Sequence, residues 1–224
     1  MFYRKQQQEI SELDKQLNWA RKKQDEHEAA MKTAREKLLG MQAAELMLAR
    51  AAEFRDPETG AHILRMAHYS QLIARRLGLD NELCERILTA APMHDIGKVG
   101  TPDHILLKPA RLDDDELEIM RRHARIGHDI LTGSDSPMIQ MAAEIALSHH
   151  EKYDGSGYPD RLAGDAISPM ARMAAIVDVY DAITADRCYH KGMPAAEALR
   201  KMWEWSSAHF DQMLLQAFMR CVGI

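Results

Sequence analysis

Residues 93–100 read MHDIGKVG, and the chemistry of the chain is organised around this stretch. His94 stands beside Asp95, so an imidazole nitrogen and a carboxylate oxygen are offered together. This pair suits a divalent metal ion of hard-to-borderline character. A lone His-Asp dipeptide is more often a buried histidine paired with its neighbouring carboxylate. The other residues of ligand type in the chain therefore decide between the two interpretations.

The composition limits the possible classes of protein. With 224 residues, the chain can form one ordinary domain plus an extension. It contains no apolar run long enough to span a bilayer. The three cysteines are far apart and lack a CxxC spacing, which argues against a disulfide framework and favours a cytoplasmic protein. The net charge of -5 does not indicate binding to a nucleic-acid polymer. An anionic small-molecule substrate stays possible, because bound cations would reverse the local charge.

Residues 1–50 are predicted to form a coiled-coil signalling helix. Seam positions recur at alternating spacings of three and four, and the residues between them are mostly Gln, Glu, Lys and Arg. The seam consists of Tyr3, Gln6, Ile10, Leu13, Leu17, Ala20, Gln24, His27, Met31, Ala34, Leu38 and Met41. Such a narrow stripe favours a homodimer in which the same helix of a second copy covers it. The alternative is a single amphipathic helix packed along its own domain.

Residues 51–224 are predicted to form an all-α domain. Amphipathic segments with helical periodicity alternate with turn signals, and no useful stretch alternates with period two. The expected fold is a helical bundle of about seven helices preceded by the long N-terminal helix. The helices are expected over residues 60–77, 80–91, 113–131, 137–150, 170–185, from 194 onward, and 210–222. Asp80 can N-cap the helix that runs through residue 91. Loops are expected at 98–111 and 153–168.

Eight side chains could bind metal ions. They are Glu58, His62, His94, Asp95, His123, His149, His150 and Asp178. Glu58 and His62 are four residues apart, which places them on one face of a helix. His94 and Asp95 are expected to follow on the third helix, counting the N-terminal helix as the first. Asp178 lies in the apolar context AAIVDVYDAIT, where a buried carboxylate needs a partner.

The number and type of these ligands indicate more than one ion. Five imidazoles and three carboxylates exceed the coordination capacity of a single ion, so we expect two or three divalent ions bridged by carboxylates. The absence of thiolates from the set excludes a structural zinc site. Histidine with carboxylate suits iron or manganese, while nickel and zinc stay open.

Two of these motifs together resemble a known family. HDIGK at 94–98 and HHEKYDGSGYP at 149–159 are similar to the paired signatures of the HD-GYP family, the cyclic dinucleotide phosphodiesterase branch of the HD superfamily. The resemblance covers about residues 50–220 and includes DVYDAITADRCY at 178–189. It implies an all-α HD domain with a bi- or trinuclear metal centre and cyclic di-GMP as the usual substrate. Family members with a glutamate at the position of Glu58 can hold a third ion, so Glu58 favours a trinuclear site.

The reaction that the resemblance implies assigns roles to individual residues. Two ions about 3.5 to 4 Å apart can activate a water and clamp a phosphodiester. We assign Asp95 as the carboxylate that bridges the central ion pair. Lys98 follows His94 by four residues, so it would share the face of His94 if the helix continues, and it would contact a phosphate oxygen.

A second phosphate contact, Arg187, is implied by the resemblance. Here the chain departs from the usual Arg-Pro-Tyr-basic pattern and reads RCYHK at 187–191. Cys188 replaces the proline, and the second basic contact falls on His190 or on Lys191.

The loop after His150 has two open interpretations. Tyr158 could offer its flat, amphipathic ring to a guanine base or to a partner protein. Alternatively, Gly157-Tyr158-Pro159 forms a rigid turn without direct contact. The resemblance also implies docking of a diguanylate cyclase domain on this tripeptide.

The function expected from the sequence is a metal-dependent phosphodiesterase that converts cyclic di-GMP to pGpG, GMP or both. One alternative is a nucleotidase or a hydrolase for a mixed cyclic dinucleotide. The other is a catalytically weak cyclic-dinucleotide sensor that signals through the coiled coil. A missing ligand would be the usual mark of such a sensor, and all eight are present.

Overall fold

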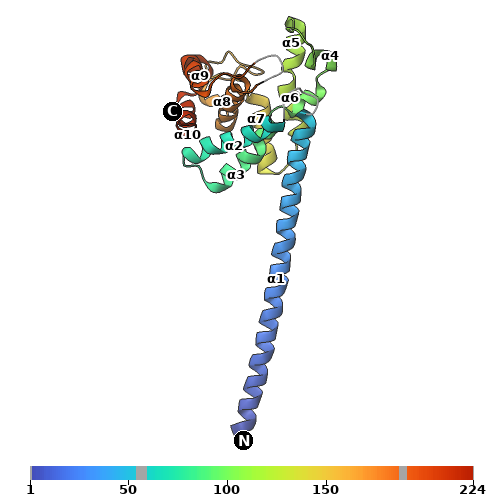
Figure 1. Cartoon of the computed structure of the whole chain (residues 1–224). Helices are drawn as coiled ribbons and strands as arrows, with labels where there is room; N and C mark the ends of the chain where they lie inside the picture. Colours follow the sequence, from blue (N-terminus) through green and yellow to red (C-terminus); the bar gives the residue numbers. More distant parts are fainter. Residues whose placement is uncertain (1, 54–59, 187–190, 224) are drawn as a thin grey trace. The chain divides into compact units, whose positions relative to one another are not determined.

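The computed structural model of the chain describes residues 2–53, 60–186 and 191–223 (Figure 1). The chain divides into two compact units, Met1–Ala44 and Glu45–Ile224. Within the described residues the regular elements are helices, together with one isolated antiparallel bridge between Asp154 and Ala163. The predicted all-α fold is therefore confirmed.

The N-terminal unit consists of one continuous helix, α1 (Phe2–Glu53), which extends into the second unit. Seam side chains on this helix expose half or more of their surface, including Leu13, Leu17, Met31 and Leu38. Gly40 is accommodated in the helix. No helix of the described residues, α1 included, is long and apolar enough to cross a membrane. The exposed stripe is what a partner helix would cover, and the coiled coil stays a prediction.

The second unit is a helical bundle built around α2. Its elements are α2 (Gly60–Arg76), α3 (Asn81–Ala90), the 3-10 helices η1 (Ala91–Met93) and η2 (Ile96–Gly100), α4 (Asp103–Leu106), α5 (Asp114–Arg121), α6 (His123–Leu131), α7 (Pro137–Ser148), η3 (Gly164–Ala166), α8 (Pro169–Thr184), α9 (Ala195–His209) and α10 (Gln212–Cys221). Helix α2 packs against α3, α8 and α10, and α7 packs against α3, α6 and α8. The core contains fully buried side chains from these helices, among them Ile63, Ile87, Ile145, Ile176 and Phe218.

Most helix boundaries follow the sequence signals. Asp80 caps α3 by accepting a hydrogen bond from the amide of Leu83, as the sequence predicts. The single helix expected over 113–131 is instead two helices, α5 and α6, which meet at Arg122. At this junction the Nδ1 atom of His123 donates a hydrogen bond to the carbonyl oxygen of Met120 at 2.7 Å. In a continuous helix this oxygen would accept a hydrogen bond from the amide of residue 124.

The split helix and the short α4 raise the number of α-helices above the expected seven. Helix α4 lies within residues 98–111, which were expected to form a loop. The described part of the second unit contains nine α-helices, α2 to α10.

Two glycines let η2 and α6 touch through their backbones. A Cβ atom added at Gly97 would lie 1.9 Å from the carbonyl oxygen of His123 and 2.4 Å from the amide nitrogen of Gly127. Likewise, a Cβ atom at Gly127 would lie 3.2 Å from the amide nitrogen of Gly97. Asp95 precedes Gly97 by two residues, so this close contact brings Asp95 beside His123.

Replacing Gly97 with alanine should therefore destabilise the second unit. The added methyl group meets backbone atoms that have no rotamer to move into, and overpacking of this kind costs about 1–3 kcal/mol. Chemical denaturation followed by circular dichroism measures the change. The matched control is Gly40→Ala, because a Cβ atom at Gly40 meets nothing within 4 Å and should stabilise the helix by about 1 kcal/mol. A Gly97→Ala protein as stable as the wild type would contradict this account.

Candidate metal centre

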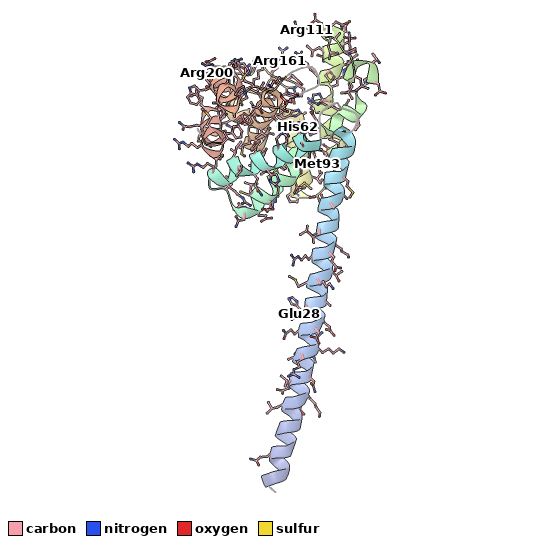
Figure 2. The ribbon with its side chains drawn as sticks, in the orientation of Figure 1. Glu28, His62, Met93, Arg111, Arg161 and Arg200 are labelled. Carbon is pink, nitrogen blue, oxygen red and sulfur yellow. The ribbon has the colours of Figure 1, made fainter. Side chains whose placement is uncertain are left out.

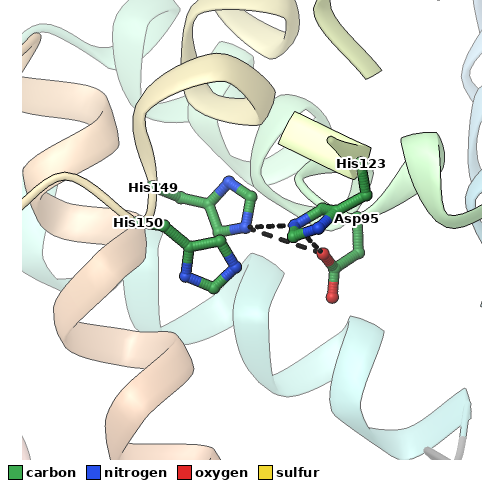
Figure 3. A group of neighbouring side chains, drawn as sticks. All are labelled: Asp95, His123, His149 and His150. Carbon is green, nitrogen blue, oxygen red and sulfur yellow. Dashed lines mark hydrogen bonds and ion pairs between the residues drawn. The ribbon is translucent and has the colours of Figure 1, made fainter. Parts of the chain in front are cut away.

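Seven of the eight predicted ligands lie in two neighbouring groups. The first group contains His62, His94 and Asp178, and the second contains Asp95, His123, His149 and His150. Within each group, one ligand atom from every residue lies within 4.8 Å of the others. Figure 3 shows the second group, in which the imidazoles and the carboxylate converge. The eighth predicted ligand, Glu58, lies outside the described residues.

The ligands come from the ends and turns of several elements. His62 lies in the first turn of α2, His123 begins α6, and His149 and His150 follow the end of α7. The expected position of His94 and Asp95 on the third helix is wrong, because α3 ends at Ala90 and these two residues form the turn between η1 and η2. Pro92, within η1, cannot donate the backbone hydrogen bond that a continuing α-helix requires.

Asp95 faces both groups with different oxygens. Its Oδ2 atom lies 3.3 Å from Nε2 of His94, in the first group. Its Oδ1 atom lies 3.2 Å from Nε2 of His123 and 3.6 Å from Nε2 of His149, in the second group. The side chain is buried, and Oδ1 accepts no hydrogen bond. A buried carboxylate in this position can join two cation sites.

The first group is completed by helix α8. The Oδ1 atom of Asp178 lies 3.9 Å from Nε2 of His62 and 3.9 Å from Nε2 of His94. Asp178 is only partly buried, with 19% of its side chain exposed, so the sequence argument from a buried carboxylate does not apply to it. The fully buried carboxylate of α8 is Asp181, one turn later.

Backbone carbonyls fix the ring protons of three histidines. Nδ1 of His94 lies 3.1 Å from the carbonyl oxygen of Ala91, and Nδ1 of His149 lies 3.0 Å from that of Ile145. His123 makes the corresponding bond to Met120. A carbonyl oxygen only accepts hydrogen bonds, so each Nδ1 carries the proton and each Nε2 of the neutral ring carries a lone pair.

These lone pairs point at one another, which tests whether the site fits metal ions. The Nε2 atoms of His123 and His149 are 3.5 Å apart, and those of His62 and His94 are also 3.5 Å apart. Two facing lone pairs repel, and a cation between them satisfies both. Together with the buried Oδ1 atom of Asp95, this arrangement fits a divalent cation in each group.

The electrostatic environment favours the protonation states that metal binding needs. Burial lowers the pKa of His149, and it lowers the pKa of His150 well below its ordinary value, with nearby imidazoles adding to the effect. Burial alone would raise the pKa of Asp95, but the positive charge of Lys98 beside it holds that pKa well below its usual value. His149 and His150 are therefore neutral and Asp95 is ionised, as metal ligands must be.

Sequence reasoning missed Asp181, which positions a ligand. Its Oδ2 atom lies 2.7 Å from Nδ1 of His62, and Arg65 donates to both of its carboxylate oxygens. A carboxylate on the far nitrogen of a ligating histidine fixes the ring orientation and makes it a better ligand. The available signal was the spacing DVYD, which puts Asp181 one helical turn after Asp178.

Lys98 reaches the site by a route that differs from the predicted one. Because η2 is a 3-10 helix that begins at Ile96, Lys98 does not share a continuous α-helical face with His94. Its Nζ atom instead lies 2.7 Å from Oδ2 of Asp95, three residues earlier in the chain. Of the other predicted substrate contacts, Arg187 lies outside the described residues, and Lys191 is exposed.

The ring of Tyr158 packs directly on a ligand. It stacks on His150 with ring centroids 4.7 Å apart, and the guanidinium carbon of Arg121 lies 5.2 Å from its centroid. Burial raises the pKa of Tyr158, so its hydroxyl is protonated.

The loop that carries Tyr158 is tightly held. Glu151 is buried and accepts hydrogen bonds from the amides of Asp160 and Leu162 at 2.7 and 3.1 Å. A Cβ atom at Gly157 would lie 2.4 Å from the amide nitrogen of Lys152. These contacts favour the rigid-turn interpretation of the loop, and the contact of Tyr158 with substrate stays a prediction.

The sequence of the chain matches known proteins over most of its length. The model of the HD domain family matches residues 27–214. A protein of Xanthomonas campestris named cyclic di-GMP phosphodiesterase response regulator RpfG is 46% identical over 173 residues, which cover 77% of this chain and 46% of the relative. A protein of Vibrio cholerae named 3'3'-cGAMP-specific phosphodiesterase 2 is 43% identical over 169 residues, which cover 75% of this chain and 32% of the relative. The chain thus spans less than half the length of these relatives.

Solved structures share the fold at low sequence identity. A phosphodiesterase from Vibrio cholerae described as cyclic GMP-AMP specific matches with a TM-score of 0.60 and 18% identity, over 81% of this chain and 48% of that one. A protein from Bdellovibrio bacteriovorus described as an HDG"Y"P protein matches with a TM-score of 0.56 and 18% identity, over 72% of this chain and 51% of that one. The fold and the sequence matches define an HD domain, and its two groups of His and Asp side chains could hold metal ions. This chain belongs to the HD domain family, and the predicted resemblance to its cyclic di-GMP phosphodiesterases is confirmed.

Replacing Asp181 with asparagine should selectively weaken the first group. The amide cannot supply the negative charge that orients His62, and loss of such a partner typically lowers metal affinity by about 10- to 100-fold. Metal content per chain after dialysis against a weak chelator should fall by about one ion, while the second group keeps its ion. The control is Asp129→Asn on the exposed surface of α6. Equal metal retention in both variants would show that Asp181 has no positioning role.

Proposed function

We propose that this chain is a metal-dependent phosphodiesterase that hydrolyses cyclic di-GMP to pGpG, GMP or both in second-messenger signalling. The observation that carries the proposal is the position of Asp95, whose two oxygens face two separate groups of histidines. Two divalent ions held in this way would activate a water and neutralise charge on the scissile phosphate.

The side chains divide between holding ions and binding substrate. His62, His94 and Asp178 would hold one ion, and the three histidines of the second group would hold the other. Asp95 would be shared between them. The imidazole and carboxylate donors suit iron or manganese, with nickel or zinc as further possibilities, and Glu58 would contribute to a third ion.

Lys98 is the described side chain best placed to reach the phosphate. Its ammonium group neutralises Asp95, a task that bound cations would take over. It is then available as a point charge for a phosphate oxygen, where it stabilises the charge that develops during cleavage. Arg187, Lys191 and Tyr158 are the further proposed substrate contacts.

A mixed cyclic dinucleotide is the second candidate substrate. The relative named as 3'3'-cGAMP-specific is 43% identical, almost the same value as the relatives named for cyclic di-GMP. The two substrates share the phosphodiester chemistry and differ in one base. The rates at which the protein hydrolyses each dinucleotide in an equimolar mixture separate the two proposals.

The two parts of the chain would have different tasks. We propose residues 1–50 as a signalling helix that joins two copies, and residues 51–224 as the catalytic domain. The exposed seam of α1 supports the first proposal. The surface around Gly157-Tyr158-Pro159 is the proposed docking site for a diguanylate cyclase domain.

Metal analysis and turnover on one sample test the enzymatic proposal. Protein purified without added metal is assayed for bound iron, manganese, nickel and zinc, and then for conversion of cyclic di-GMP after reconstitution with each metal. Two or more ions per chain and formation of pGpG or GMP are expected, and Asp95→Ala should abolish both because it removes the shared ligand. Asp135→Ala, at an exposed loop position, is the control that should keep both. Full metal occupancy with dinucleotide binding but without turnover would establish the sensor alternative instead.

Replacing Leu17 with lysine should dissociate the proposed homodimer. Leu17 lies on the apolar seam, and a charge there would have to be desolvated against the partner helix. Light scattering coupled to size-exclusion chromatography should change from dimer to monomer mass. The control is the neighbouring Asn18→Lys, which lies off the seam and should leave the mass unchanged. A Leu17→Lys protein that stays dimeric would place the dimer contact elsewhere.

A further inference from the structure

A pocket lies beside the candidate metal centre. It has a volume of about 640 Å³ and is lined by residues of α5 and α6 and by the loop 155–161, including Tyr158. None of the seven described metal ligands lines it. Pockets that hold nucleotide-sized molecules have volumes of about 300–1,000 Å³. The pocket is therefore large enough for a ligand of its own.

The lining of this pocket is rich in arginine. Four guanidinium groups belong to it, those of Arg121, Arg122, Arg125 and Arg161. The carboxylates that offset them are Glu118 in the lining and Asp160, which pairs with Arg125 at 2.5 Å. Positive charge stays in excess after both are counted. Guanidinium groups bind phosphate oxygens through paired, charge-assisted hydrogen bonds, so this pocket favours a phosphate-bearing ligand.

One of these arginines is held in a strained backbone conformation. Arg161 has a φ angle of 55°, in the left-handed region that residues with a Cβ atom rarely adopt. The two hydrogen bonds that Glu151 accepts from Asp160 and Leu162 hold the chain on either side of it. Strain that the surrounding structure enforces is found chiefly at ligand sites. The loop thus holds Arg161 in the pocket lining although its backbone conformation is unfavourable.

Tyr158 lines the pocket and also contacts the candidate metal centre. Its ring stacks on His150 of the second group, and Arg121 of the pocket lies over the same ring. A ligand that draws Arg121 toward a phosphate would act on the packing around His150. Occupancy of the pocket is therefore linked physically to a metal ligand.

We propose that the arginine-lined pocket binds a phosphate-bearing nucleotide at a site separate from the one where the phosphodiester is cleaved. The four guanidinium groups would hold the phosphate, and the volume would accept the nucleoside. The inference rests on the proposed function in one respect, namely that the neighbouring site cleaves a phosphodiester. The evidence for the pocket is its own lining.

Calorimetry on the metal-loaded full chain tests the proposal with GMP as the probe. Guanosine and inorganic phosphate serve as the comparison ligands. The test variant is the double substitution Arg125→Gln and Arg161→Asn, since asparagine tolerates the left-handed conformation and neither arginine contacts a described metal ligand. The control is Arg200→Gln, an exposed arginine on α9 (Figure 2).

The expected result is a GMP site that the control keeps and the double variant loses. Removal of a charge-assisted phosphate contact should weaken GMP binding by about tenfold or more. The same site should persist in Asp95→Ala, which separates it from any binding of GMP to the metal ions. Guanosine and inorganic phosphate should each bind more weakly than GMP, and the KM for cyclic di-GMP should be little changed in the double variant.

Three results would overturn the proposal. One is unchanged GMP affinity in the double variant. Another is inorganic phosphate binding as tightly as GMP, which would limit the pocket to simple anions. The third is a raised KM for cyclic di-GMP together with loss of the GMP site, which would make the pocket part of the substrate site. Because GMP binding is measured without turnover, absence of cyclic di-GMP hydrolysis would refute the proposed function and leave this test intact.

Discussion

The buried carboxylate of Asp95 imposes the constraint on which this structure depends. A negative charge in the protein interior requires compensation, and Asp95 is surrounded by the Nε2 atoms of His94, His123 and His149. Burial disfavours a second proton on His149, so this ring brings no positive charge to the carboxylate. Lys98 supplies a permanent positive charge at this carboxylate, with its Nζ atom 2.7 Å from Oδ2 of Asp95. The arrangement is one in which metal ions would complete the charge balance.

The fold serves this site by fixing short distances between elements that are remote in sequence. The backbone contact between Gly97 and α6 sets the separation of Asp95 from His123. Carbonyl oxygens at the ends of η1, α5 and α7 then orient three imidazoles with their lone pairs inward. Helix α8 adds Asp178, a predicted ligand, and Asp181 as the partner of His62. Contacts within the protein thus orient these rings, which lowers the reorganisation needed to bind ions.

Much of this could be predicted from the sequence because it depends on residue type and local spacing. Helical periodicity and capping residues such as Asp80 predicted most helices. Convergence of seven ligands was expected from their chemistry and is found. The break at Arg122 could not be predicted, because it depends on a side chain bonding a backbone carbonyl. Asp181 was overlooked because its role requires knowing which face of α8 meets His62.

The arginine pocket illustrates a second limit of prediction from sequence. Its charges come from residues 118–125 and 155–161, two segments with no shared motif, and only the tertiary fold brings them together. Nothing in their spacing along the chain signals a common ligand. Sequence patterns therefore reveal sites whose residues lie in short motifs. Sites assembled from separate surface residues are found only from the structure.

Anomalous diffraction from crystals of the iron- or manganese-loaded protein tests the central claim most directly. Data collected at the absorption edge of the metal locate each ion independently of the protein model. The account predicts two peaks on opposite sides of the Asp95 carboxylate, one contacted by His62, His94 and Asp178 and one by His123, His149 and His150. A single peak, or peaks that leave Asp95 out of the coordination, would contradict it.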